Sequence, residues 1–156
     1  MTKKYFWLIS SVIVFVCGYV VHIAYEVSNR AAWSILVSSN NDSPWEMTKP
    51  FALVYIMFVF IELSCLRPSL LHFVCSKIIM LHGFALLSVT LLEIFGKIPA
   101  VLIFVSLCVS EFLSYRINSS KCRIELFSIP IFISFVLFFA VLLFASVYPP
   151  NIFPFI

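Results

Sequence analysis

Long apolar runs separated by short polar segments dominate the chain. A helix needs about 20 apolar residues to cross the hydrocarbon core of a bilayer, which is roughly 30 Å thick. Five runs are long enough, and we expect transmembrane helices at about residues 5–26, 49–66, 69–95, 98–117 and 124–147. The connecting segments are short except for residues 27–48. The pattern predicts an all-α polytopic transmembrane bundle of about five helices, forming one unit over residues 1–156.

The composition indicates that lipid is the main solvent of this chain. Hydrophobic residues make up 63% of it and charged residues 11%, whereas soluble domains contain about 45–50% and about 25% respectively. A chain of this length could not bury so much apolar surface in water. The net charge of +3 is scattered along the chain, and nucleic-acid binding requires a basic patch. We therefore expect a lipid bilayer as partner and no nucleic acid.

The basic residues that flank the runs predict the orientation. The first run follows Lys3 and Lys4 but is longer than the roughly 7–15 apolar residues of a signal peptide, so we expect it to stay in the membrane. Cytoplasmic segments are enriched in Lys and Arg. A cytoplasmic N-terminus and an extracytoplasmic C-terminus place six flanking basic residues inside and three outside; the inner ones are Lys3, Lys4, Arg67, Arg116, Lys121 and Arg123, and the outer ones Arg30, Lys49 and Lys97. We expect a multi-pass protein of the cell membrane with segment 27–48 outside.

The most polar stretch of the chain, "NNDSPWEMTKPF", ends this outer segment. Ser43 is a favourable N-cap residue, Pro44 suits a first helical turn, and Glu46 completes the spacing of a capping box. Trp45 and Lys49 are typical of the membrane interface. A helix start therefore accounts for these residues without any function.

Further polar residues are expected at the same outer level. His22 and Glu26 are four positions apart, hence on one helix face, and Glu93 lies near the outer end of its helix, with His82 deeper on that face. The candidate outer pocket comprises His22, Glu26, Asn41, Trp45, Glu46, Lys49 and Glu93. Imidazoles and carboxylates can bind a divalent cation or perform acid–base chemistry, but the spacing matches no metal motif such as HExxH. We predict no cofactor; a divalent metal on His22 and Glu26 stays an alternative, as does ion pairing with Arg30, Lys49 or Lys97.

A second polar layer is predicted deeper in the membrane. Glu62, Lys77 and Glu111 lie on three different helices at similar depth. A charge near the middle of a bilayer costs about 2.5–3.5 kcal/mol even on the lenient insertion scales, so it normally has a partner inside the bundle. We predict that Lys77 pairs with Glu62, Glu111 or both. The layer is either a structural clasp, which we favour, or a proton or ion relay.

These motifs resemble the signature of an uncharacterised family of small multipass bacterial membrane proteins, Asn-Glu-Ser-x-Trp-Glu-His-x-Lys. Asn41, Ser43, Trp45, Glu46 and Lys49 match it; His22, Tyr25, Glu26, Pro149 and Pro150 match two further family motifs. The resemblance implies about five helices in a bacterial cell membrane and no particular reaction. Asp42 replaces the family's Glu and Met47 its His, which weakens a catalytic or metal role.

The sequence favours a non-enzymatic integral membrane protein that binds a lipid headgroup or a protein partner at the outer pocket. The catalytic residues of any reaction stay unknown, because no nucleophile motif is present. One alternative is a membrane-embedded enzyme acting on a lipid or lipid-linked substrate at the outer leaflet, with Glu46 or Glu26 as acid–base group and His22 as its partner. Another is transport of protons or small solutes through the deeper charged layer, although inverted repeats and broken helices, which are common in transporters, are not evident.

Overall fold

The fold is described from a computed structural model, which defines residues 5–29, 31, 34–38, 43–66, 69–96, 98–120 and 123–147. All regular structure in these residues is helical. The elements are α1 (Phe6–His22), α2 (Ala24–Val27), α3 (Ser34–Val37), α4 (Pro44–Leu66), α5 (Leu70–Phe95), α6 (Pro99–Asn118), the 3-10 helix η2 (Ile124–Phe127) and α7 (Ser128–Val147). The predicted all-α bundle with five main helices is confirmed. Arg30, Asn41, Asp42, Lys97 and the tail from residue 148 lie outside the described residues.

Three helices differ from the apolar runs, and in one of them the run 124–147 begins with the 3-10 helix η2 before α7 starts at Ser128. Helix α4 begins at Pro44 instead of residue 49, because Ser43 acts as its N-cap: the Ser43 Oγ accepts a hydrogen bond of 3.3 Å from the Glu46 N–H. The first run is divided, since α1 ends at His22 and α2 follows after a turn at Ile23. Apolar length predicts the membrane span, whereas capping residues determine where the helix starts.

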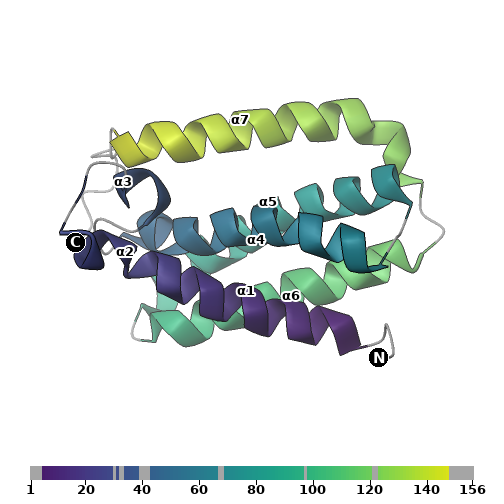
Figure 1. Cartoon of the computed structure of the whole chain (residues 1–156). Coiled ribbons are helices and arrows are strands. Elements are labelled where there is room, and N and C mark those ends of the chain that lie inside the picture. Colours follow the sequence, from purple (N-terminus) through teal and green to yellow (C-terminus); the bar gives the residue numbers. More distant parts are fainter. Residues whose placement is uncertain are drawn as a thin grey trace.

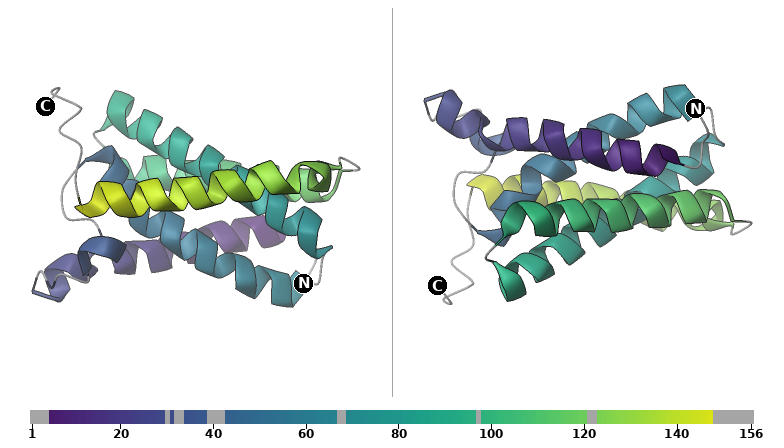
Figure 2. Two further views of the ribbon diagram at one scale, coloured as in Figure 1. Left: turned by 90° about the horizontal axis from the view of Figure 1, so that it is seen from above. Right: turned by 90° about the horizontal axis from the view of Figure 1, so that it is seen from below.

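The five main helices run up and down in three layers (Figure 1). Helices α1 and α6 form one layer and α4 and α5 the next, and these four pack into a closed ring in which α1 contacts α4 and α6 contacts α5. Helix α7 lies outside the ring, mainly against α5, on the side away from α1 (Figure 2). We call the end where α1 and α5 begin the N-end, and the end that carries α2, α3 and the start of α4 the loop end.

The surface of this bundle is apolar and its interior is partly polar. Large apolar side chains are exposed on the main helices, including Met57 and Leu86 with 70% and 74% of their surface accessible. The buried side chains include many serines together with Glu62, Lys77 and Glu111. Four helices, α4, α5, α6 and the segment that contains α7, are long and apolar enough to cross a membrane, and α1 is a shorter apolar helix. The chain is therefore an integral membrane protein.

Gly18 sets the close approach of α1 to α4. It is buried, and a Cβ at this position would clash with the ring of Phe51. We expect Gly18→Ala to lower the free energy of unfolding by about 1–3 kcal/mol, the usual cost of overpacking. A Cβ added at Gly83 on α5 would meet no atom within 4 Å, so Gly83→Ala is the matched control and should cause no loss. SDS titration of both purified variants measures the difference, and equal stabilities would contradict the prediction.

Candidate functional site

Lys77 of α5 joins two carboxylates from the neighbouring helices of the ring. Its Nζ lies 2.5 Å from Glu62 Oε2 on α4. It also donates to both carboxylate oxygens of Glu111 on α6, at 2.8 Å for Oε1 and 2.6 Å for Oε2. The prediction that Lys77 pairs with Glu62, Glu111 or both is thus confirmed, with both as partners. We call these three residues the buried triad.

The buried triad is connected to all four helices of the ring. Ser10 of α1 donates a hydrogen bond from its Oγ to Glu62 Oε1. The rings of Tyr55 and Phe73 flank the Lys77 amine, with centroids 5.3 Å and 5.6 Å from Nζ, distances at which a cation is attracted to an aromatic face. Each triad residue exposes no more than 3% of its surface. The triad is therefore a fully enclosed polar centre.

The charges of the buried triad do not cancel when all three groups are ionised. Two carboxylates and one ammonium group leave one net negative charge. Two further titratable side chains interact with its carboxylates, Tyr55 of α4 and Cys108 of α6, and both are uncharged in their ordinary state. Ser10, from α1, adds a hydroxyl and no charge. None of these three neighbours supplies a second cation, and a proton bound to either carboxyl group would make the triad neutral.

Three polar side chains lie between the buried triad and the N-end. Ser76 precedes Lys77 on α5, and Ser114 and Asn118 follow Glu111 by three and seven positions on α6. Asn118 Nδ2 donates to Ser76 Oγ at 2.7 Å, and the two serine hydroxyls are 3.4 Å apart. We call Ser76, Ser114 and Asn118 the polar path. They continue the face of α6 that carries Glu111, because positions three and seven apart share a helix face.

A separate polar group lies at the loop end. Lys49 Nζ donates to Glu46 Oε2 at 2.8 Å, with both side chains at most 3% exposed. One residue earlier, the Thr48 hydroxyl is 3.1 Å from the Ser88 hydroxyl of α5. On the other side, Ser38 donates from its Oγ to the His22 carbonyl oxygen at 2.5 Å. These contacts join the start of α4 to α5, and join the segment beside α3 to the end of α1.

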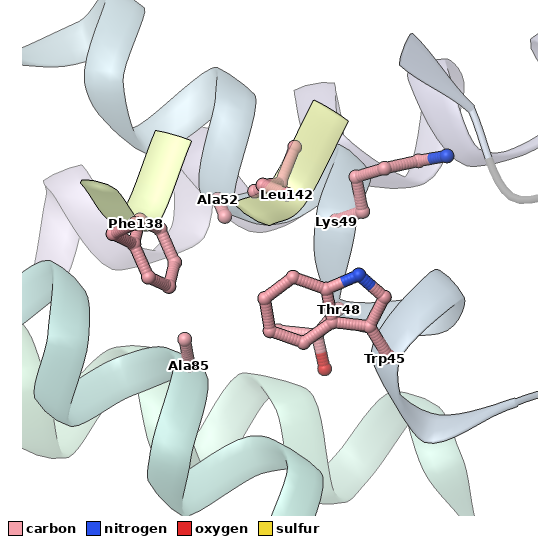
Figure 3. Close-up of a pocket in the computed structure, with 7 residues that line it drawn as sticks. All are labelled: Trp45, Thr48, Lys49, Ala52, Ala85, Phe138 and Leu142. Carbon is pink, nitrogen blue, oxygen red and sulfur yellow. The ribbon is translucent and has the colours of Figure 1, made fainter. Parts of the chain in front are cut away.

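Trp45 adds a contact with α7 and lines a shallow hollow (Figure 3). Its ring meets that of Phe138 edge to face, with centroids 6.0 Å apart. The hollow is lined by Trp45, Thr48, Lys49, Ala52, Ala85, Phe138 and Leu142. It has no room for a water molecule, and the Lys49 amine points away from it. The aromatic and charged side chains of the predicted motif therefore pack the helices together at this end.

The other members of the candidate outer pocket are placed less closely. The His22 ring is half-buried, with its centroid 6.4 Å from that of Phe51. Glu26 and Glu93 are exposed, and Asn41 lies outside the described residues. His82 faces α7, with Nε2 3.3 Å from the Ser134 carbonyl oxygen. Among the residues that the structure describes, no three His, Cys, Asp or Glu side chains are grouped closely enough to hold a metal ion.

Several residues of these sites were missed in the sequence. Ser10 lies five residues after the start of the first run, and Glu62 lies four residues before the end of the next helix. Both are therefore at a similar depth from the same membrane surface, and a comparison of depths that included the first run would have paired them. Asn118 falls on the Glu111 face at the seventh following position. His72, whose Nδ1 is 2.9 Å from Glu125 Oε2, joins α5 to η2 at the N-end. A single serine in an apolar helix does not by itself indicate a polar contact. Its depth in the membrane, compared with that of charged residues on other helices, is the more informative property.

Comparison with known protein families, curated proteins and solved structures finds no match for this chain.

Proposed function

We propose that this integral membrane protein is non-enzymatic and works through one exchangeable proton bound by the buried triad, in a cell membrane. The main support is that a single Lys77 amine contacts both Glu62 and Glu111, at 2.5–2.8 Å. All three side chains are buried. The relay reading of the deeper layer is thus preferred to a purely structural clasp.

The triad is expected to bind a proton because it contains one carboxylate more than the lysine can neutralise. A purely structural ion pair would be neutral with one carboxylate for one lysine. An uncompensated charge inside a membrane costs several kcal/mol. Two carboxyl groups that share a site do not both ionise readily, since each disfavours the charge on the other. The Lys77 amine contacts both carboxylates and supplies one of the two positive charges that they require. A proton is therefore the ligand that fits.

The reading as an outer-leaflet enzyme has less support. Its acid–base candidate Glu46 is buried against Lys49, and the adjacent hollow admits no water molecule. A hydrolytic or transfer reaction requires the acid–base group to reach its substrate. In this arrangement the Glu46 carboxylate stabilises the first turns of α4.

Binding of a lipid headgroup or a protein partner at the loop end is the second candidate function. The observation that favours it is the exposure of two carboxylates, Glu26 and Glu93, near that end. A cationic headgroup or a basic segment of a partner would complement them. Native mass spectrometry of the protein in mild detergent tests this: the Glu26→Gln/Glu93→Gln variant should lose a component that the wild type retains, and retention would contradict it.

Infrared spectroscopy of the protein in lipid nanodiscs tests the proton directly. The wild type should show the carbonyl stretch of a protonated, buried carboxyl group at neutral pH. Glu62→Gln and Glu111→Gln should each remove this band, because the remaining carboxylate then pairs with Lys77 in a neutral site. Glu125→Gln, which changes a partly exposed carboxylate at the N-end, is the control and should retain it. A wild type without the band at any pH, or a band that survives in both single variants, would overturn the proposal.

A further inference from the structure

We infer that the proton of the buried triad is exchanged on one side only, through the polar path of Ser76, Ser114 and Asn118 to the N-end. The inference rests on the proposed function, since it concerns access to the same proton. It names the residues that control access and predicts the side from which the proton comes. With the predicted orientation, that side is the cytoplasm.

Distances along the helices place the triad nearer to one end of the bundle. Glu62 is four residues from the end of α4 at Leu66, and Lys77 is seven residues from the start of α5 at Leu70. Glu111 is seven residues from the end of α6 at Asn118. At 1.5 Å per residue, these separations are roughly 6–10 Å. All three residues are thus nearer to the N-end than to the loop end.

The side chains on the two sides of the triad also differ in their chemistry. Toward the N-end, the polar path offers two hydroxyls and an amide, joined by the 2.7 Å bond from Asn118 Nδ2 to Ser76 Oγ. Asn118 is only half-buried, so it forms the outer limit of this path. Polar groups of this kind can hold bridging water molecules, which transfer protons.

Toward the loop end, a layer of mainly aromatic and aliphatic side chains follows the triad. It also contains the Tyr55 hydroxyl, which interacts with Glu111, and the buried Ser106 of α6. Tyr55 and Phe84 stack with their ring centroids 6.3 Å apart and their planes 4° from parallel. Leu81 and Leu107 complete this layer, and all four are at most 2% exposed. The layer separates the triad from Thr48, Ser88 and the Glu46–Lys49 pair. Closely packed aromatic and aliphatic side chains hold little water, so we expect this side to be closed to the proton.

Helix α5 offers a matched pair of serines for the experiment. Ser76 and Ser88 are both fully buried, and each donates to the carbonyl oxygen three residues earlier, at 2.9 Å and 3.2 Å. Each also faces one hydroxyl of a neighbouring helix, Ser114 for Ser76 and Thr48 for Ser88. They differ in their side of this layer and in the additional hydrogen bond that Ser76 accepts from Asn118 at 2.7 Å.

The experiment follows the rate at which the carboxyl band shifts when nanodiscs with the full chain are transferred to D₂O. Ser76→Ala should slow this exchange by a factor of about five to ten, the effect of one lost hydrogen bond on a barrier. Asn118→Leu, which keeps the volume but removes the polar group, should slow it likewise. Ser88→Ala should leave the rate unchanged.

The outcomes separate the two proposals. If the band is present and exchange is equally fast in Ser76→Ala and Asn118→Leu, or is slowed as much by Ser88→Ala, the path is wrong and the proton site stands. If the wild type has no band, the proposed function fails and the path with it. Because Ser76→Ala and Asn118→Leu change different helices, a folding defect in one leaves the other to decide.

Discussion

Replacement of Lys77 by Met should lower the free energy of unfolding at neutral pH by about 3–5 kcal/mol, since removal of one partner strands the other charges of a buried cluster. In the wild type, the Lys77 amine is the partner of both Glu62 and Glu111. Without it, two carboxyl groups remain in an interior that exposes no more than 3% of either residue. SDS titration of the purified variant, followed by tryptophan fluorescence, measures the loss.

The loss should shrink as the pH falls. The two stranded carboxyl groups bind protons in the folded variant, whereas in the unfolded chain they are ionised at neutral pH. The folded state then binds more protons than the unfolded state, so the stability of the variant rises as the pH is lowered from about 8 to about 5. Leu81→Met, on the same helix, is the control, because a volume-conserving apolar change costs less than about 1.5 kcal/mol. The prediction would be contradicted if the Lys77→Met variant were as stable as this control, or if its free energy of unfolding did not change with pH.

The second large effect is expected for the combined removal of both carboxylates. Each single change, Glu62→Gln or Glu111→Gln, leaves one carboxylate for the lysine and should be tolerated. The double variant leaves the Lys77 ammonium group without either partner, and we expect a loss of about 3–5 kcal/mol. The two changes should therefore be strongly non-additive, as is usual for residues within one charged network.

Addition of Lys77→Met to the double variant should restore stability. The three positions are then uncharged, and replacement of a whole buried ion cluster is often neutral or stabilising by about 1–4 kcal/mol. The triple variant would keep the fold but lack the carboxyl band. A triple variant that is no more stable than the double variant would show that the lysine charge is not the cause of the loss.

Much of the membrane architecture follows from the sequence. The apolar runs predict the five main helices, because lipid requires continuous apolar segments whose backbone hydrogen bonds are satisfied internally. The pairing of Lys77 follows from depth alone, since a charge in hydrocarbon must find a partner. The sequence does not predict which helices form the ring. A helix face that packs on lipid and one that packs on protein have the same apolar composition. The outer position of α7 is one such case: its residues are as apolar as those of α5.

The function of the outer motif, residues 41–49, could not be predicted from its residue types alone. Its aromatic and charged residues suggest a binding site, yet Trp45 packs on Phe138 and Glu46 pairs with Lys49 inside the protein. Sequence spacing gives the level of a residue along the membrane normal but not its direction around the helix axis. The convergence of His22, Glu26 and Glu93 with Glu46 therefore stays a prediction. The likeness of the motif to a bacterial family also stays a prediction.

The order of the triad along the chain has a consequence for biosynthesis. Glu62 and Lys77 belong to consecutive helices, of which α4 ends at Leu66 and α5 begins at Leu70. These two helices can therefore leave the translocon together, with the two charges paired. Glu111 is synthesised later, when the lysine already has a carboxylate partner. Transfer of α6 from the translocon into lipid is then least costly with Glu111 uncharged. Under the proposed function, the proton would thus be acquired during insertion, as the last part of the triad to be assembled.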